Sequence, residues 1–237
     1  MNINKRILEI NKKLTAFFGL PKRNKKLPDA VDLLIATILS QNTNDKNSFQ
    51  AYQRLKLRFP EWEDAAKANR LSIEKEIRIA GLGVQKSKAI KEFLKGVIKK
   101  RSEISLDYLS RLSNTEALKE LINFKGIGIK TASCVLLFAL DRNVCPVDTH
   151  VHRTLNRIGL VNTSNPDKTY TALNGDFPEK VAHSFHTNLI RLGREICKPS
   201  KPLCIKCPLL KICSYSEKNL ERNSSLKEKS FMLLDNI

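Results

Sequence analysis

Four of the six cysteines lie within seventeen residues, in the stretch REICKPSKPLCIKCPLLKIC. They are Cys197, Cys204, Cys207 and Cys213, at the spacing C-x6-C-x2-C-x5-C. Four thiolates that meet at one point can hold a tetrahedral zinc ion or a cubane iron-sulfur cluster. Zinc ribbons usually bring two C-x2-C pairs from separate places, whereas this stretch has one such pair between longer arms. The spacing therefore favours an iron-sulfur cluster over zinc.

A lysine and an aspartate upstream of the cysteines could carry out nucleophilic and acid-base chemistry. Lys130 follows Gly126 and Gly128 and lies in the first turn of an expected helix, where a cation is unfavourably placed against the helix dipole. A neutral lysine amine is a nucleophile. Asp148 comes two residues after Pro146 and directly before another helical pattern, where its default role is to cap the helix.

The elements that must position Lys130 are two helices joined by a glycine turn. Ser113 and Glu116 have capping-box spacing, which predicts the start of the first helix, and residues 130–140 have the apolar spacing of the second. Gly126 and Gly128 would let the backbone come close to a phosphate, and the amides of the next helix could bind it. An ordinary helix-helix turn with a glycine C-cap is the alternative.

The charge of the chain favours the phosphate interpretation. Lys and Arg number 42 and Asp and Glu 24 among 237 residues, which gives a net charge of +18. Such a surplus suits a polyanion, either nucleic acid or an anionic membrane. The longest apolar runs, at 33–39 and 135–140, are far shorter than the roughly 20 residues that span a bilayer. The N-terminus also lacks the pattern of a secretory signal, so we expect no membrane partner and a reducing compartment.

Hydrophobic spacing is helical almost everywhere along the chain. Val31, Leu34, Ile35, Ile38 and Leu39, for example, recur at the intervals of one buried helix face. Sustained alternation of the kind typical of strands is absent. We therefore expect an all-α protein of about ten helices, followed at 217–237 by a basic polar tail that need not be ordered.

Over about residues 28–215 the chain resembles the endonuclease III family of helix-hairpin-helix DNA glycosylases. The resemblance depends on LLIATILSQNTND, LINFKGIGIKTASCVLL, PVDTHVHR and the cysteine spacing, which occur in the family's order. It implies two helical domains that flank a DNA-binding cleft, with Lys130 and Asp148 facing each other across it. Residues 28–141 would form a helical-barrel domain with the helix-hairpin-helix motif, and 1–27 with 142–216 an iron-sulfur cluster domain.

The resemblance also implies an activity and a cofactor. Lys130 would attack C1′ of a damaged nucleotide with help from Asp148, form a Schiff base and permit β-elimination, while Gly126 and Gly128 hold the DNA backbone. The expected enzyme is a base-excision-repair glycosylase and abasic-site lyase that removes oxidised pyrimidines. The four cysteines would hold one structural 4Fe-4S cluster. The alternatives are a thymine or uracil mismatch glycosylase of the same superfamily and a non-catalytic DNA-binding protein.

The SQNTND loop resembles the segment that fills the gap left when a base is flipped out of the duplex. The commoner family pattern has glutamine two positions after the serine, where this chain has Asn42, with Gln41 beside it. We expect both amides to bind DNA, and Asn44 and Asp45 to cap a helix that begins near Lys46. The expected partner is double-stranded DNA with damaged bases, bound by a monomer in the cytoplasm, in association with the nucleoid.

Overall fold

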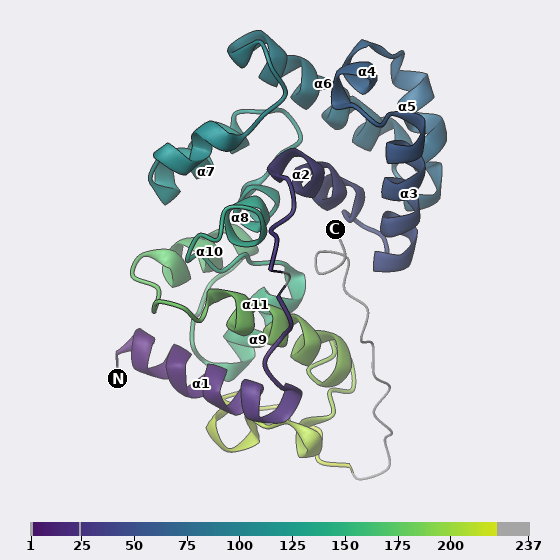
Figure 1. Cartoon of the computed structure of the whole chain (residues 1–237). Helices are drawn as coiled ribbons and strands as arrows, with labels where there is room; N and C mark the ends of the chain where they lie inside the picture. The colour runs from purple at the N-terminus through teal and green to yellow at the C-terminus, as the bar shows by residue number, and fades with distance from the viewer. Residues whose placement is uncertain (1, 24, 222–237) are drawn as a thin grey trace. The chain divides into compact units, whose positions relative to one another are not determined.

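The computed structural model describes residues 2–23 and 25–221 (Figure 1). The fold of these residues is all-helical, as predicted. This part of the chain contains eleven α-helices, one more than the expected count, together with short 3-10 segments and no β-strand. Before Cys197 the chain forms a π-helix, Leu192–Ile196. Most of the predicted polar tail, residues 222–237, lies outside the described residues.

The described residues form two compact units, one of residues 25–142 and one of residues 2–23 and 143–221. The first unit contains α2 (Ala30–Leu39), α3 (Asp45–Arg58), α4 (Trp62–Lys67), α5 (Arg70–Ile77), η1 (Arg78–Ala80), α6 (Gly83–Arg101), η2 (Asp107–Arg111), α7 (Asn114–Ile122) and α8 (Ile129–Phe138). The second contains α1 (Ile3–Phe18), α9 (Thr149–Ile158), α10 (Pro166–Asn174), α11 (Ala182–Arg191), η3 (Leu192–Ile196), η4 (Cys204–Lys206) and η5 (Leu210–Ile212). The domain boundaries expected from the resemblance stay a prediction.

Helix α2 is the central helix of the first unit. Every residue of α2 except Asp32 is buried, and the helix packs against α3, α6 and α8. The apolar residues therefore surround the helix rather than forming a single stripe, which is typical of a fully buried helix. The loop at residues 40–44 begins where α2 ends, so the core of the unit fixes the start of this loop.

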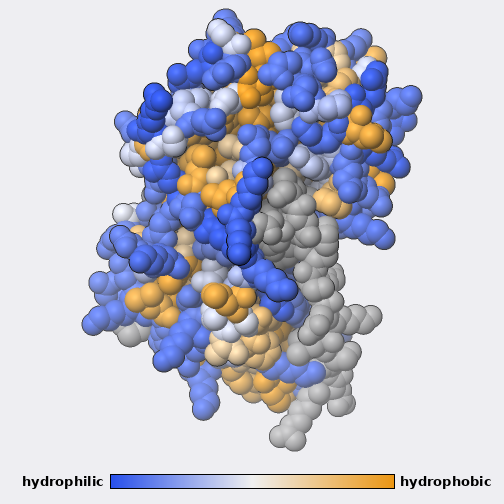
Figure 2. All heavy atoms as spheres, viewed as in Figure 1, coloured by the Kyte–Doolittle hydropathy of each residue, from blue (hydrophilic) through white to orange (hydrophobic). Residues whose placement is uncertain are grey.

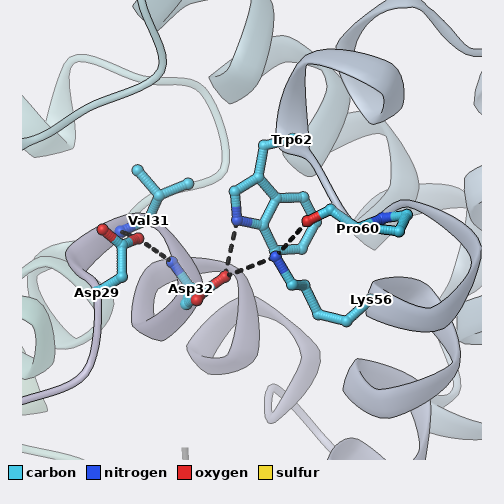
Figure 3. A network of polar contacts seen from close by, with 6 residues as sticks. All are labelled: Asp29, Val31, Asp32, Lys56, Pro60 and Trp62. Carbon is cyan, nitrogen blue, oxygen red and sulfur yellow. Dashed lines mark hydrogen bonds and ion pairs between the residues drawn. The ribbon is translucent and has the colours of Figure 1, made fainter.

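Two aspartates lie at the start of α2, and one of them, Asp32, connects the helix to α3 and α4 (Figure 3). Asp29 caps the helix, because its Oδ1 accepts hydrogen bonds from the amides of Val31 and Asp32 at 2.8 and 2.9 Å. Asp32 accepts a hydrogen bond from the indole Nε1 of Trp62 at 2.7 Å and pairs with Lys56 at 3.6 Å. Burial, followed by the charge of Asp32, raises the pKa of Tyr52. This network has a structural role, since it fixes the N-terminus of α2.

The second unit is built around α9 and α11. Helix α1 packs against α11, and α11 packs against α9. Arg6 of α1 donates a hydrogen bond to the carbonyl of Gly159 at 2.6 Å, just after the end of α9. Arg191 of α11 donates one to the carbonyl of Phe18 at 2.8 Å, at the end of α1. The N-terminal helix α1 and helix α11 thus support α9, the helix that Asp148 caps.

Candidate functional site

The predicted helix-hairpin-helix is present in the first unit. The capping box forms, because the amide of Glu116 donates to Ser113 Oγ at 3.3 Å and the amide of Ser113 donates to Glu116 Oε2 at 2.9 Å. Gly126 has a φ of +88°, and a Cβ there would lie 2.8 Å from the Cβ of Ala89. The turn therefore requires glycine at position 126 for two reasons, its backbone conformation and its close approach to α6.

The second glycine of the turn has a different environment. Gly128 has a φ of −95°, which any residue can adopt, and a Cβ at this position would meet no atom within 4 Å. It is the N-cap of α8 but has no side chain to cap the first amides. The fold therefore does not require glycine here, and the space that a Cβ of residue 128 would occupy is open.

Lys130 is the second residue of α8 and is half-buried. The next eight residues, from Thr131 to Phe138, are all buried, so the rest of the helix belongs to the core. The Lys130 ammonium group makes no hydrogen bond or ion pair with any residue in the described ranges. Its position is thus fixed by the helix, while its amine stays available for a reaction.

The loop at residues 40–44 lies beside the start of α8. Gln41 Nε2 donates to Thr131 Oγ1 at 3.3 Å, one residue after Lys130. Asn42 is exposed and has a φ of +51°, a conformation that asparagine tolerates better than most residues. The predicted cap at Asn44 is confirmed, since its Oδ1 accepts from the amide of Asn47 at 2.8 Å. The DNA contacts of Gln41 and Asn42 stay predictions.

Asp148 caps α9 in the second unit, as predicted. Its Oδ1 accepts a hydrogen bond from the amide of Val151 at 2.8 Å. The side chain is half-buried, and Oδ2 accepts no hydrogen bond from the part of the chain that the structure describes. One oxygen therefore holds the helix while the other is available for chemistry.

Two side chains that the sequence did not indicate hold the segment before Asp148. The amide of Cys145 donates to Asn174 Oδ1 at 2.6 Å, and Asn174 Nδ2 donates to the carbonyl of Cys145 at 3.0 Å. His186, only 1% exposed, has its Nδ1 at 2.9 Å from the carbonyl of Pro146. We call Asn174 and His186 the clamp. No local pattern predicts it, because the partners lie 29 and 40 residues apart in the chain.

His150 lies near Asp148 at the start of α9. Burial is the main cause that lowers the pKa of His150. The charge of Asp148 opposes this effect, whereas the nearby cations of Arg153 and Arg194 add to it. We therefore expect a neutral imidazole at neutral pH, which leaves the negative charge of Asp148 uncompensated by His150.

The four clustered cysteines line one pocket of the second unit, together with apolar side chains that include Ile158, Leu192, Ile196 and Leu210. None of these four cysteines is in a disulfide bond. Burial, with the neighbouring thiols as a further cause, raises the pKa of Cys207 to about 12. Within residues 2–23 and 25–221, however, no group of three or more His, Cys, Asp or Glu residues is arranged to hold a metal ion.

Two arginines of α9 form hydrogen bonds with the backbone of the loop that lines this pocket. The sequence did not indicate this role. Arg157 donates to the carbonyls of Lys198 and Pro199 at 2.6 and 2.9 Å, and its guanidinium lies 4.3 Å from the ring centroid of Tyr215. Arg153 donates to the carbonyl of Cys197 at 3.0 Å. Basic residues next to a thiolate cluster could be read as DNA contacts, but these two have structural partners.

Hydrophilic residues cover most of the described surface that faces the viewer in Figure 2. This agrees with the charged fraction of the chain, which is 28%. The helices in the described ranges are all too short or too polar to cross a bilayer.

Known proteins with a similar sequence or structure show the family of the chain. The pattern of the HhH-GPD superfamily base excision DNA repair protein matches residues 35–179. Endonuclease III of Thermotoga maritima is 35% identical over 193 residues, which are 81% of this chain and 86% of that protein. An Arabidopsis thaliana protein named as a DNA glycosylase is 40% identical over 185 residues, 78% of this chain, and the chain spans only 62% of its length.

A solved structure has the same fold. It is a trapped covalent intermediate of endonuclease III with DNA, described as an estranged-adenine complex, and it covers 90% of this chain and 96% of its own. The TM-score is 0.75 and the sequence identity is 26%. The chain therefore belongs to the HhH-GPD superfamily of base excision DNA repair proteins, as a DNA glycosylase homologous to endonuclease III.

Proposed function

We propose that this glycosylase also cleaves the abasic site that it creates, with Lys130 as the nucleophile, and that it removes oxidised pyrimidines from duplex DNA. The open space at the Cβ position of residue 128 carries the proposal. A turn that has no conformational need for glycine at this position, followed by uncapped helix amides, suits a ligand that must come close to the backbone. A DNA phosphate has the charge and the oxygen acceptors for such a position.

In the proposed reaction the Lys130 amine attacks C1′ of the damaged nucleotide. The bond between C1′ and the base nitrogen breaks, and the base leaves with its electron pair and takes up a proton. Opening of the sugar ring gives a Schiff base between Lys130 and C1′. A proton then leaves C2′ and the C3′–O bond breaks, so that the 3′ phosphate is released by β-elimination. An amine without protein partners is suited to this attack.

We assign to Asp148 the role of assisting this attack. Its free Oδ2 can accept a proton from the attacking amine or stabilise the positive charge that develops on the sugar. Oδ1 keeps its hydrogen bond to Val151 throughout, so the helix need not move during the reaction.

The flipped base leaves a gap in the duplex, which the loop at residues 40–44 is proposed to fill. Asn42 is the better candidate for the tip, because it is exposed, whereas Gln41 donates to Thr131. In this proposal Gln41 connects the loop to the helix of the nucleophile and rotates toward the DNA only if its bond to Thr131 breaks.

The four cysteines share one pocket, and their spacing C-x6-C-x2-C-x5-C supports a 4Fe-4S cluster as the proposed cofactor. Cys197, Cys204, Cys207 and Cys213 would hold such a cluster as thiolates and leave no open position for a substrate. When bound, the cluster would supply cross-links between distant parts of the loop rather than catalysis.

Trapping with borohydride tests the lyase proposal. Wild-type protein should form a covalent complex with duplex DNA that contains an oxidised pyrimidine, Lys130→Gln should form none, and the exposed Lys119→Gln should behave like wild type. A panel with thymine mismatches and uracil tests the substrate class. Turnover of the best substrate by Lys130→Gln at the wild-type rate would contradict the role of Lys130.

Iron and acid-labile sulfide analysis tests the cofactor proposal. Protein purified without oxygen should contain about four irons and four sulfides per chain, and Cys207→Ser should lose most of both. Stoichiometric zinc without sulfide would contradict a cluster.

A further inference from the structure

Lys86 is a lysine in an unfavourable position. It lies in the first turn of α6 (Gly83–Arg101) and is 1% exposed. Burial of an ammonium group is costly, and a cation at a helix N-terminus also opposes the helix dipole. Burial and the helix dipole both destabilise the charged form of Lys86, so other interactions must stabilise it. The partners in these interactions indicate the role of the residue.

Two backbone carbonyls provide this compensation. Lys86 Nζ donates to the carbonyl of Leu39 and to that of Ala80, both at 2.8 Å. Each carbonyl belongs to the last residue of a helix, α2 or η1, where carbonyls lack partners in their own helix. Burial lowers the pKa of Lys86 to about 8, so the charged form that donates these bonds predominates at neutral pH. No carboxylate in the described ranges pairs with it.

Both carbonyls stand at the start of a turn. Leu39 is followed by the loop at residues 40–44, and Ala80 by Gly81 and the exposed Leu82, whose φ is +52°. The geometry points to Lys86 as a positioning residue that holds the 40–44 loop in the conformation that presents its amides to DNA. This inference rests on the proposed function, in which that loop fills the gap left by the flipped base.

A purely structural role would predict a different result, and the same helix offers a matched control. Lys91 of α6 also donates to two carbonyls, of Ala66 at 2.6 Å and of Ala68. These carbonyls lie at the C-terminal end of α4, far along the chain from the 40–44 loop. Lys86→Met and Lys91→Met therefore each remove an ammonium group that donates to two carbonyls near the end of a helix. Only the carbonyl of Leu39, a partner of Lys86, leads into the proposed DNA-binding loop.

The test measures the kinetics of both variants on duplex DNA with an oxidised pyrimidine. Lys86→Met should raise KM about tenfold and keep kcat within about threefold, because the loop is misplaced while Lys130 and Asp148 are intact. Lys91→Met should keep both parameters within about twofold. Hydrogen exchange should become faster at residues 40–44 in Lys86→Met alone.

Unchanged KM and unchanged exchange at residues 40–44 in a folded Lys86→Met would overturn the inference and leave the proposed function intact. Absence of activity in the wild-type protein would instead contradict the proposed function. Lys86→Gln, which keeps one donor group, serves if Lys86→Met does not fold. It should give a smaller rise in KM, and a wild-type KM in Lys86→Gln would likewise overturn the inference.

Discussion

The hairpin that carries Lys130 and the segment that carries Asp148 are held in place in two different ways. The hairpin depends mainly on nearby residues, because its capping box spans the four residues from Ser113 to Glu116 and its turn needs Gly126 for its φ. The Asp148 segment depends on the clamp of Asn174 and His186, whose partners lie 29 and 40 residues away in the chain. The turn before the proposed nucleophile is thus shaped mainly by local structure, and the segment before the proposed carboxylate by tertiary contacts.

This difference separates the two regions in their response to mutation. Local structure loses stability when a conformational preference is removed, and the loss stays near the change. A tertiary clamp leaves buried polar backbone groups without partners when it is removed, which costs more and displaces a longer segment. Changes at the two regions can therefore be compared directly.

The largest effect is expected at Asp148 itself. Asp148→Asn should lower the rate of base excision by about 10²- to 10⁴-fold, because the negative charge is lost. The thermal midpoint should change little, since asparagine caps helices as well as aspartate. Asp148→Ala should lose the same activity and, in addition, about 1 kcal/mol of stability with the cap. A near wild-type rate in Asp148→Asn would leave the aspartate with a structural role only.

A smaller effect is expected at the clamp. Asn174→Ala should lower the free energy of unfolding by about 1–3 kcal/mol, because the amide and carbonyl of Cys145 lose their partner. Excision should slow as well, through displacement of Asp148. Asn174→Asp keeps the acceptor for the Cys145 amide but places a carboxylate oxygen against the carbonyls of Cys145 and Tyr170, so it should lose stability as well. Denaturant unfolding measures the stability of both variants. A wild-type free energy of unfolding in Asn174→Ala would show that the clamp is dispensable.

The smallest effects are expected at the two glycines of the hairpin. Gly126→Ala should lower the free energy of unfolding by about 1–2 kcal/mol, because the positive φ at position 126 is unfavourable for alanine and its Cβ would crowd Ala89. Gly128→Ala should leave stability unchanged or slightly higher and yet weaken DNA binding, since its methyl group occupies the space proposed for a phosphate. Unfolding and DNA titration at fixed salt separate these outcomes. Equal stability losses for both variants would contradict the distinction between them.

The sequence predicted the elements whose signals are local. The all-α class, the capping box at Ser113, the glycine turn and the N-caps at Asn44 and Asp148 all depend on residues within a few positions of each other. Local hydrogen bonds and the φ preference of glycine decide such features before the chain packs. The prediction of about ten helices is close to the eleven α-helices of the described residues, although short helices such as α4 (Trp62–Lys67) carry little periodicity.

The sequence could not predict the residues that act over long distances. Lys86 resembles any lysine of a basic helix until its burial against the ends of α2 and η1 is known. Asn174 is the last residue of α10 (Pro166–Asn174), and its side chain holds Cys145, which lies 29 residues earlier in the chain. Such roles depend on the tertiary arrangement, and no spacing in the chain encodes them.

The most direct test of the central claim is to locate the covalent adduct. Wild-type protein trapped with borohydride on damaged duplex DNA is digested, and the peptides are sequenced by mass spectrometry. The proposed mechanism predicts one modified residue, Lys130, in the peptide that contains the start of α8. An adduct on another lysine, or turnover of the substrate without any adduct, would contradict the assignment of Lys130 as the nucleophile.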